Sequence, residues 1–422
     1  MRIGTSQVDI APAVGSELSG FAARTQPSIG VLDPLYARAL YLEDGDERLL
    51  WVHCDVIGFR REFVEAFRGW ATDSLGLPPG RVMLSATHTH AGPATVVLHE
   101  AGEYDRRYVA WLDGRLREAA MAAAARTEAC QLVAVEGRCD LAVDRRGRAT
   151  AHTDPRVAAG GWRRDDGTYI AVLVNYPMHP VALGPVNRHI SADWPGRTAA
   201  ALTRDLPGGP MVLVASGGCG NLNSPEENVS VDQVDDWGGQ VASAVIDHLR
   251  EASSLANPLL RVCSRTVRLP MEALTPAQID AYAERSLQNV AGLSEWGDKF
   301  RRAIGVWRHN MTEAVKKQAG LDTAEAELFG VRLGNTVTIG INAEVFSVLA
   351  DDLRRRTGTS VYVVGYANGV IGYLPTTAAF DEGGYEVEMA HLFYDSFRPR
   401  RGALDFLADH AAKVVGDLMT AS

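Results

Sequence analysis

Two histidines within residues 85–93 (SATHTHAGP) have the types and the spacing that could bind a metal ion. The segment follows the apolar residues 82–84 and ends in Gly-Pro, a turn signal, so it reads as a strand that runs into a loop. In an extended stretch His88 and His90 lie two positions apart, and both imidazoles leave the same face. Neutral imidazole is a common zinc ligand, although a pair of hydrogen-bonded core histidines would show the same spacing.

Two further polar residues stand at the ends of predicted strands. His179 follows the apolar residues 169–176, and Glu344 follows the apolar residues 337–341. A carboxylate in apolar surroundings is unfavourable unless it is paired or bound to a metal. Taken singly, His179 has a simpler explanation as a core histidine, and Glu344 as a charge that matches a helix N-terminus.

Glycine-rich loops near the C-terminus bring several tyrosines close to these positions. Tyr366 and Tyr373 lie within residues 365–376, and Tyr385 follows a Gly-Gly pair. Tyrosine in such a loop more often packs than binds. The joint presence of His88, His90, His179, Glu344 and these tyrosines is what favours a site.

The elements that must position these residues alternate along the chain. Strands are predicted over 49–54, 169–176, 211–215 and 337–341, and helices over 60–75, 108–126, 196–203, 345–355 and 404–419. Thr275-Pro276 is a good helix start, and a charged helical pattern continues to about residue 317. We therefore predict an α/β fold, a layered mixed sheet with flanking helices, a metal site at the strand ends and one helical insertion over about 275–317. No internal repeat is visible in the sequence.

Composition and charge argue against a nucleic-acid-binding, secreted or membrane-spanning protein. The chain has 422 residues, of which 46% are hydrophobic, and a net charge of −10. An acidic chain is a poor nucleic-acid partner, because phosphate binding needs a basic face. The N-terminus lacks the apolar core of a signal peptide, and no apolar run is long enough to span a bilayer. The five cysteines are scattered, without a CxxC pair, so we expect reduced thiols in a cytoplasmic protein that contacts no membrane.

Ordered motifs over nearly the whole chain resemble the catalytic domain of the neutral (non-lysosomal) ceramidases and shorter bacterial proteins similar to it. The motifs are DIAP (9–12), DPLYARA (33–39), THTHAGP (87–93), NYPMHP (175–180), ISADWPG (190–196), GNLNSP (220–225), AEVF (343–346) and GYLPT (372–376). The resemblance implies one ceramidase-like catalytic domain over residues 1–422, and we expect no C-terminal β-sandwich domain of the kind that ceramidases carry.

The resemblance also implies a zinc site. Its ligands would be His88, His179, Glu344 and Tyr373, with Tyr366 and Tyr385 as nearby alternatives to Tyr373. His90 would be the catalytic imidazole beside the ion or would support the ligands from behind. Asp193 would orient a ligand imidazole or would simply cap its loop.

One loop departs from the family pattern. Ceramidases carry a serine in a Gly-Asp-Val-Ser-Pro-like loop, and here Asn221 replaces the acid while Asn223 stands where the serine is expected. Ser224 fits only if the register shifts by one residue. We therefore expect Asn221 and Asn223 to donate hydrogen bonds to a substrate oxyanion, and we group them with His90 and Tyr385 as candidate catalytic residues.

These features predict a zinc-dependent hydrolase that cleaves a C–N amide bond of a small polar metabolite with a metal-activated water. Its partner is then a small-molecule substrate, and a homodimer is the expected assembly. Arg24, Arg38 and Arg188 could bind a substrate carboxylate, although solvated surface is their commoner role. Two alternatives stay open: an esterase, lactonase or non-hydrolytic cyclase on the same scaffold, and a non-catalytic metal- or ligand-binding protein.

Overall fold

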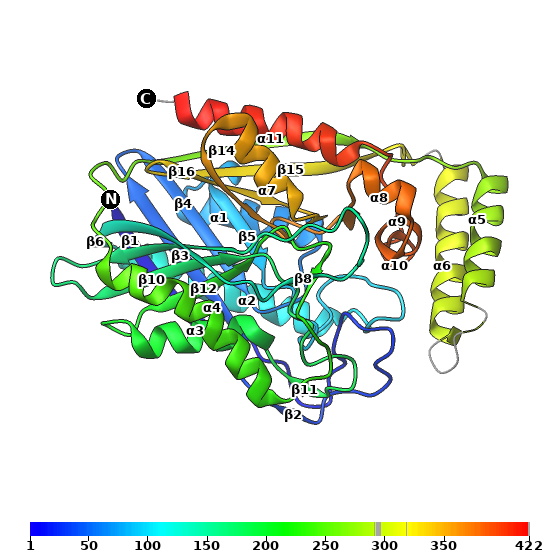
Figure 1. The fold of residues 1–422 in the computed structure, drawn as a ribbon, viewed down its shortest axis with the longest axis horizontal. Helices are drawn as coiled ribbons and strands as arrows, with labels where there is room; N and C mark the ends of the chain where they lie inside the picture. Colours follow the sequence, from blue (N-terminus) through cyan, green and yellow to red (C-terminus); the bar gives the residue numbers. More distant parts are fainter. Residues whose placement is uncertain (291, 293–296, 318, 421–422) are drawn as a thin grey trace.

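Three sheets with the same strand plan form the centre of the molecule (Figure 1), in a computed structural model that describes residues 1–290, 292, 297–317 and 319–420. The first sheet has the order β5-β4-β3-β1-β6, with strands Val82–Ala86, Glu47–Cys54, Tyr36–Asp44, Arg2–Asp9 and Glu128–Ala129. The second has the order β12-β10-β9-β7, with strands Met211–Ser216, Tyr169–Tyr176, Arg156–Arg163 and Gln131–Arg138. The third has the order β14-β15-β16-β18, with strands Leu260–Pro270, Thr323–Leu333, Thr336–Ile341 and Ser360–Val364.

Each sheet is built by the same sequence of elements. Three antiparallel neighbours are followed by a crossover helix and a fourth strand that pairs in parallel with the third. The crossover helices are α1 (Arg61–Leu75), α3 (Asp193–Asp205) and α7 (Val348–Thr357), and each unit closes with α2 (Arg106–Ala125), α4 (Val231–Glu251) or α11 (Ala403–Thr420). The chain thus contains one structural unit three times, a repeat that its sequence does not reveal.

The sheets face one another across a shared apolar core. Trp51 and Met83 of the first sheet, Trp162 and Leu213 of the second, and Phe329 of the third belong to one buried cluster. The helices cover the outer faces: α1 and α2 pack on the first sheet, α3 and α4 on the second, and α7 and α11 on the third. Burying both faces of each sheet explains why several strands read as continuous apolar runs instead of alternating ones.

The predicted mixed α/β fold with flanking helices is confirmed, with its strands divided among three sheets. Helix α1 stops where predicted, because Gly76 adopts the left-handed conformation that ends a helix (φ 66°). Strands β14 and β15 were not predicted, since their alternating charged residues gave no clear apolar run.

The helical segment predicted over about 275–317 contains α5 (Pro276–Asn289) and α6 (Gly297–Lys316), while residues 291 and 293–296 of that prediction lie outside the described residues. Thr275 and Gln278 form a capping box that starts α5. The two helices pack together at one end of the molecule, beside α8–α10 (Figure 1). In the part of the chain that the structure describes, no helix has the length and apolar character needed to cross a membrane.

Short elements complete the fold. The 3-10 helix η1 (Pro79–Arg81) leads into β5. The other short elements are the strand pairs β2–β11 (Gly30–Val31 and His189–Ile190), β8–β13 (Val143–Asp144 and Leu222–Asn223) and β17–β19 (Glu344–Val345 and Tyr373–Leu374), and the helices α8 (Thr377–Glu382), α9 (Tyr385–Glu388) and α10 (Ala390–Phe393).

A buried histidine on β4 makes the core sensitive to acid. His53 is fully buried, with Nδ1 2.8 Å from Ser85 Oγ and Nε2 3.0 Å from the carbonyl of Val214 on the second sheet. Burial lowers the pKa of His53 from 6.5 to about 4. The native state therefore keeps this imidazole neutral at pH values where the unfolded chain binds a proton. Its contribution to stability is complete above pH 6.5 and is lost as the pH falls toward 4.

We expect the free energy of unfolding to fall by about 3 kcal/mol over this pH window through His53 alone. In the His53→Gln variant, stability should be lower at pH 7 but its decline between pH 6.5 and 4 should be shallower. Urea unfolding at several pH values measures both. The exposed His248→Gln variant is the control, and an equally steep decline in His53→Gln would contradict the prediction.

Candidate metal centre

The ends of three strands, one from each structural unit, are tied together by hydrogen bonds. Gly365 N–H, after β18, donates to Ser216 O at the end of β12 (3.1 Å), and Ser216 Oγ donates to Thr87 O after β5 (2.8 Å). Ala86 N–H in turn donates to Tyr366 O (3.3 Å). These bonds close a ring through the three units, so the loops that leave it start from fixed positions.

Two imidazoles, those of His88 and His179, lie at the centre of this region, and hydrogen bonds to backbone carbonyls fix the tautomer of each. His88 Nδ1 lies 2.5 Å from Ile57 O, and His179 Nδ1 lies 2.7 Å from Cys219 O. A carbonyl oxygen only accepts, so each Nδ1 carries the hydrogen and each Nε2 keeps its lone pair. Both residues are buried, and His88 has a left-handed backbone (φ 66°), a strained conformation that is often kept at functional sites.

The carboxylate of Glu344 faces the same two Nε2 atoms. Its Oε2 lies 3.4 Å from His88 Nε2 and 3.2 Å from His179 Nε2, while its Oε1 accepts a hydrogen bond from the hydroxyl of Tyr394. Three acceptor atoms from three structural units therefore point at one another, an arrangement that a bound cation stabilises.

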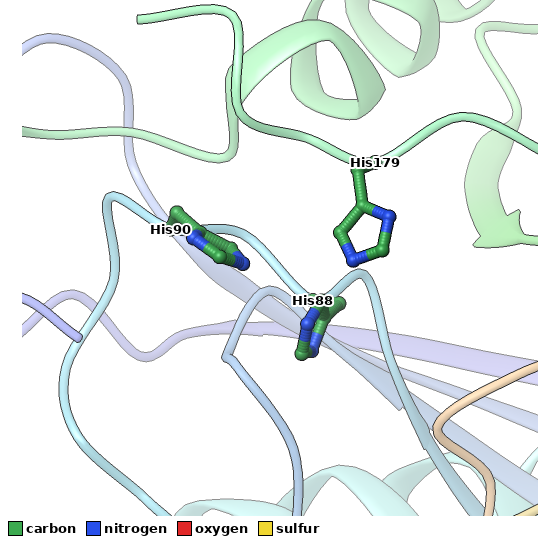
Figure 2. A group of neighbouring side chains, drawn as sticks. All are labelled: His88, His90 and His179. Atoms are coloured by element: carbon green, nitrogen blue, oxygen red, sulfur yellow. The ribbon is translucent and has the colours of Figure 1, made fainter. Parts of the chain in front are cut away.

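His90 completes a cluster of three imidazoles (Figure 2). One ring nitrogen from each of His88, His90 and His179 lies within 4.8 Å of the others. Both nitrogens of His90 are buried, and neither finds a hydrogen-bond partner among the described residues. Burial, followed by the neighbouring His88 and His179, lowers the pKa of His90 well below its usual range. His90 is thus a neutral base whose polar atoms need a ligand, a water or a substrate.

Close packing of a glycine fixes the position of His90. A Cβ added to Gly20, whose φ is +99°, would lie only 2.4 Å from His90 Nδ1. The loop that carries Gly20 can therefore press against the imidazole only because it has no side chain there.

The residues present fit a divalent metal ion, in either of two overlapping sets. His88 and His179 belong to both, and the third ligand is Glu344 in one set and His90 in the other. Imidazole nitrogens with a carboxylate are typical zinc ligands, and zinc sites that perform catalysis use three protein ligands and leave one position open. The carbonyl partners of both Nδ1 atoms supply the outer hydrogen bonds that orient ligand histidines.

Two tyrosines contact the ligand residues directly: Tyr394 bonds to Glu344 Oε1, and Tyr366 approaches both His179 and Glu344. The Tyr366 hydroxyl lies 3.2 Å from His179 Nε2 and 3.4 Å from Glu344 Oε2, and its ring stacks on His88 with centroids 3.8 Å apart. Tyr373, the predicted fourth ligand, lies with its ring centroid 6.5 Å from that of His179 and lines the neighbouring cavity. Tyr373 as a ligand stays a prediction, and Tyr366 is its nearer rival.

The two asparagines of the departing loop have structural partners. Asn221 uses both N–H bonds on Asp144 Oδ2 (2.7 Å) and His152 O (3.0 Å), while its Oδ1 accepts from Ser347 N–H. Its side chain does not line the cavity beside the metal ligands. The structure therefore gives Asn221 a role in holding the scaffold, in place of the predicted bond to a substrate oxyanion.

Asn223 joins two charged side chains instead of facing the ligands. Its Oδ1 accepts from Arg145 Nη1 (3.0 Å), and its Nδ2 donates to Glu227 Oε1 (2.9 Å). Ser224, the possible substitute for the family's serine, donates to Glu226 O. Asn223 thus reaches the cavity only through Glu227, which lines it.

The arginines considered for substrate binding are engaged within the protein. Arg24 donates to four backbone carbonyls, on Ser19, His90, Gly184 and Asn187, and burial lowers its pKa to about 10. Arg38 forms a buried ion pair with Asp55 (2.8 Å), and Arg188 donates to Pro27 O. Arg24 therefore clamps the loops around the site together.

Asp193 caps its own loop, which is the second of the two roles considered for it from the sequence. Its carboxylate accepts from Leu183 N–H (3.1 Å) and Trp194 N–H (2.7 Å), and burial raises its pKa to about 6. Trp194 then donates its indole N–H to His179 O.

A cavity of about 310 Å³ opens beside His88, His90 and Glu344. Most of its wall is apolar or aromatic, and the aromatic members are Phe21, Phe300, Tyr373, Tyr385, Phe393 and Tyr394. Tyr385 is 42% exposed and stands at the solvent side. A concave, mostly apolar pocket with a few convergent polar groups is the usual form of a small-molecule site.

Two solved structures share this fold over almost the whole chain. They are the neutral ceramidase from Pseudomonas aeruginosa and a ceramidase complexed with C2, each with a TM-score of 0.73 and 16% identity over 99% of this chain. The chain has a neutral ceramidase-like fold. The match covers 74% and 75% of those two chains, and at this identity it establishes the fold alone. The resemblance read from the ordered motifs is confirmed at that level. No protein-family model and no curated protein matches the sequence.

Removing either shared imidazole should release the metal. We expect His88→Ala and His179→Ala each to weaken zinc binding by more than about 100-fold, since even an outer partner of a ligand accounts for 10- to 100-fold. Elemental analysis after dialysis against a weak chelator measures this. His248→Ala, on the outer helix α4, is the control. Full zinc retention in both variants would remove the site.

Proposed function

We propose that this protein is a zinc-dependent hydrolase that cleaves a C–N amide bond. The observation that carries the proposal is the convergence of His88 Nε2, His179 Nε2 and Glu344 Oε2, with the unpaired imidazole of His90 beside them. The shared fold with two ceramidases supports amide chemistry. Zinc held by these residues would lower the pKa of a bound water and polarise a carbonyl.

The chain's own residues supply the remaining steps of hydrolysis. A ring nitrogen of His90 accepts a proton from the attacking water and returns it to the leaving amine, because its lowered pKa keeps it neutral beforehand. Tyr394 holds Glu344 in place through the Oε1 bond. Tyr385 lines the cavity, and its hydroxyl, which is protonated at neutral pH, can donate to a substrate oxygen.

The cavity walls favour a substrate with a compact apolar group over the wholly polar metabolite expected from the sequence. The aromatic side chains gain most from covering an apolar acyl chain or ring, and the volume of about 310 Å³ limits its size. The expected cytoplasmic location and homodimer remain predictions.

A panel of matched substrates tests the proposal. Zinc-loaded protein should hydrolyse N-propylbenzamide, lose this activity on chelation and regain it with added zinc. His90→Asn should keep its zinc but lower kcat by about 100-fold, because it removes the base and not the ion. Product release followed by chromatography measures both.

Other outcomes of the same panel point to other functions. Turnover of ethyl benzoate or a lactone without turnover of the amide would support an esterase or lactonase. Full zinc occupancy with no turnover of any substrate would support a binding protein. Loss of zinc from His90→Asn would make His90 a ligand instead of the base.

One wall of the cavity comes from the α5–α6 hairpin. Phe300 on α6 lines the cavity and meets Phe393 edge to face, with ring centroids 5.2 Å apart. Lys299 holds the helix in place by donating to Arg24 O (2.8 Å), and Arg302 forms an ion pair with Glu100. The hairpin therefore sets one boundary of the space available to a substrate.

Shortening Phe300 should enlarge that space. We expect Phe300→Ala to shift the preference from benzamides toward amides of longer acyl groups by about tenfold in kcat/KM, the scale of one pocket contact. The exposed Val306→Ala variant on the same helix is the control. An unchanged chain-length preference would show that the hairpin does not limit the substrate.

A further inference from the structure

One carboxylate stands apart in the cavity beside the metal ligands. Glu227 and Glu344 are the two acidic residues that line it, and Glu344 faces the imidazoles. Among the described lining residues there is no lysine or arginine. Glu227 therefore brings a negative charge to a wall that is otherwise mostly apolar and aromatic.

The orientation of Glu227 is fixed by the asparagine that replaces the family's serine. Arg145 can only donate, so its bond to Asn223 assigns the oxygen of the amide to that side. Asn223 must then turn its N–H groups toward Glu227, where Nδ2 lies 2.9 Å from Oε1. Burial raises the pKa of Glu227, and the N–H donor on one oxygen opposes that shift while the second oxygen stays available to a ligand.

The arginines next to Asn223 form ion pairs with glutamates other than Glu227. Arg145 and Arg146 both pair with Glu386, and Arg146 also lies 3.5 Å from Glu382. Two arginines and two glutamates thus neutralise one another as a group. Arg145 also acts electrostatically on Glu227, but among the described residues no ion pair within 4.0 Å joins Glu227 to an arginine or lysine.

From this geometry we infer that Glu227 binds a cationic ammonium group of the substrate, while the amide to be cleaved lies at the metal end of the same cavity. An ammonium matches both the free carboxylate oxygen and the aromatic walls, because ring faces attract cations. The substrate class is then an amide of a compact apolar acyl group whose amine part carries a second, charged amine. This inference rests on the proposed function.

A pair of nearly isosteric amides tests it: N-(2-aminoethyl)benzamide, which carries an ammonium, and the neutral N-propylbenzamide. Binding is measured by calorimetry on zinc-loaded protein in the His90→Asn background, so that neither ligand is consumed. We expect the cationic amide to bind about fivefold more tightly than the neutral one, the upper range for an exposed ion pair. Glu227→Gln should reduce that ratio to about one.

Glu226→Gln is the matched control, because this exposed neighbour makes the same change in net charge without lining the cavity. It should keep the full preference. No preference in the parent protein, a preference retained in Glu227→Gln, or no measurable binding of either amide would each overturn the inference.

Turnover of the neutral amide by the wild-type protein would still support the proposed hydrolase. A preference that depends on Glu227 without turnover of any amide would contradict the hydrolase and leave the cation site standing.

Discussion

Everything at the centre of this protein depends on three acceptor atoms: Glu344 Oε2 lies 3.4 Å from His88 Nε2 and 3.2 Å from His179 Nε2. His88 Nε2, His179 Nε2 and Glu344 Oε2 would separate in a flexible chain, because lone pairs repel and a buried carboxylate loses its hydration. They stay together because each imidazole is pinned through Nδ1 to a backbone carbonyl and the carboxylate through Oε1 to Tyr394. A bound cation would relieve this repulsion, so the fold preorganises the three acceptor atoms for a metal ion.

The threefold architecture explains how residues so distant in sequence reach one point. In each unit the third and fourth strands run in parallel, so both end at the same edge of their sheet. His88 follows the fourth strand of the first unit, while His179 and Glu344 follow the third strands of the second and third units. The ring of bonds through Thr87, Ser216 and Gly365 then holds the three edges together. The site is therefore a property of how the units meet, and the shared core of Trp51, Trp162 and Phe329 fixes that meeting.

The sequence predicted those site residues that a neighbouring sequence pattern marks, and it missed those whose role depends on partners far along the chain. His88, His179 and Glu344 were predictable because each follows an apolar strand within a few residues, and that placement needs no knowledge of the other units. The choice between Tyr373 and Tyr366 stays open, because both belong to one glycine-rich stretch and only its folded path decides which hydroxyl reaches the ligands. The structural roles of Asn221 and Arg24 come from partners far along the chain, such as Ser347 and Asn187, which no local pattern encodes. The repeat was hidden for the same reason: packing preserves a topology while the residues that fill it differ.

The buried acceptor cluster is rigidly held, whereas the opposite walls of the cavity come from exposed segments. The acceptor cluster sits on strand ends and is fully buried, so its geometry tolerates little change, as the close approach of Gly20 to His90 illustrates. The opposite walls come from exposed segments: the loop that carries Glu227, the helix that carries Phe300, and Tyr385 at the solvent side. Because these segments hold none of the acceptor atoms, their side chains can vary in charge and size without disturbing the acceptor cluster. Asn223 lies between the two regions, where its amide joins Arg145 to Glu227 and so orients a charge at the rim. If the proposed hydrolysis holds, substitutions in the walls change which substrate is accepted, whereas substitutions at the strand ends change whether any is cleaved.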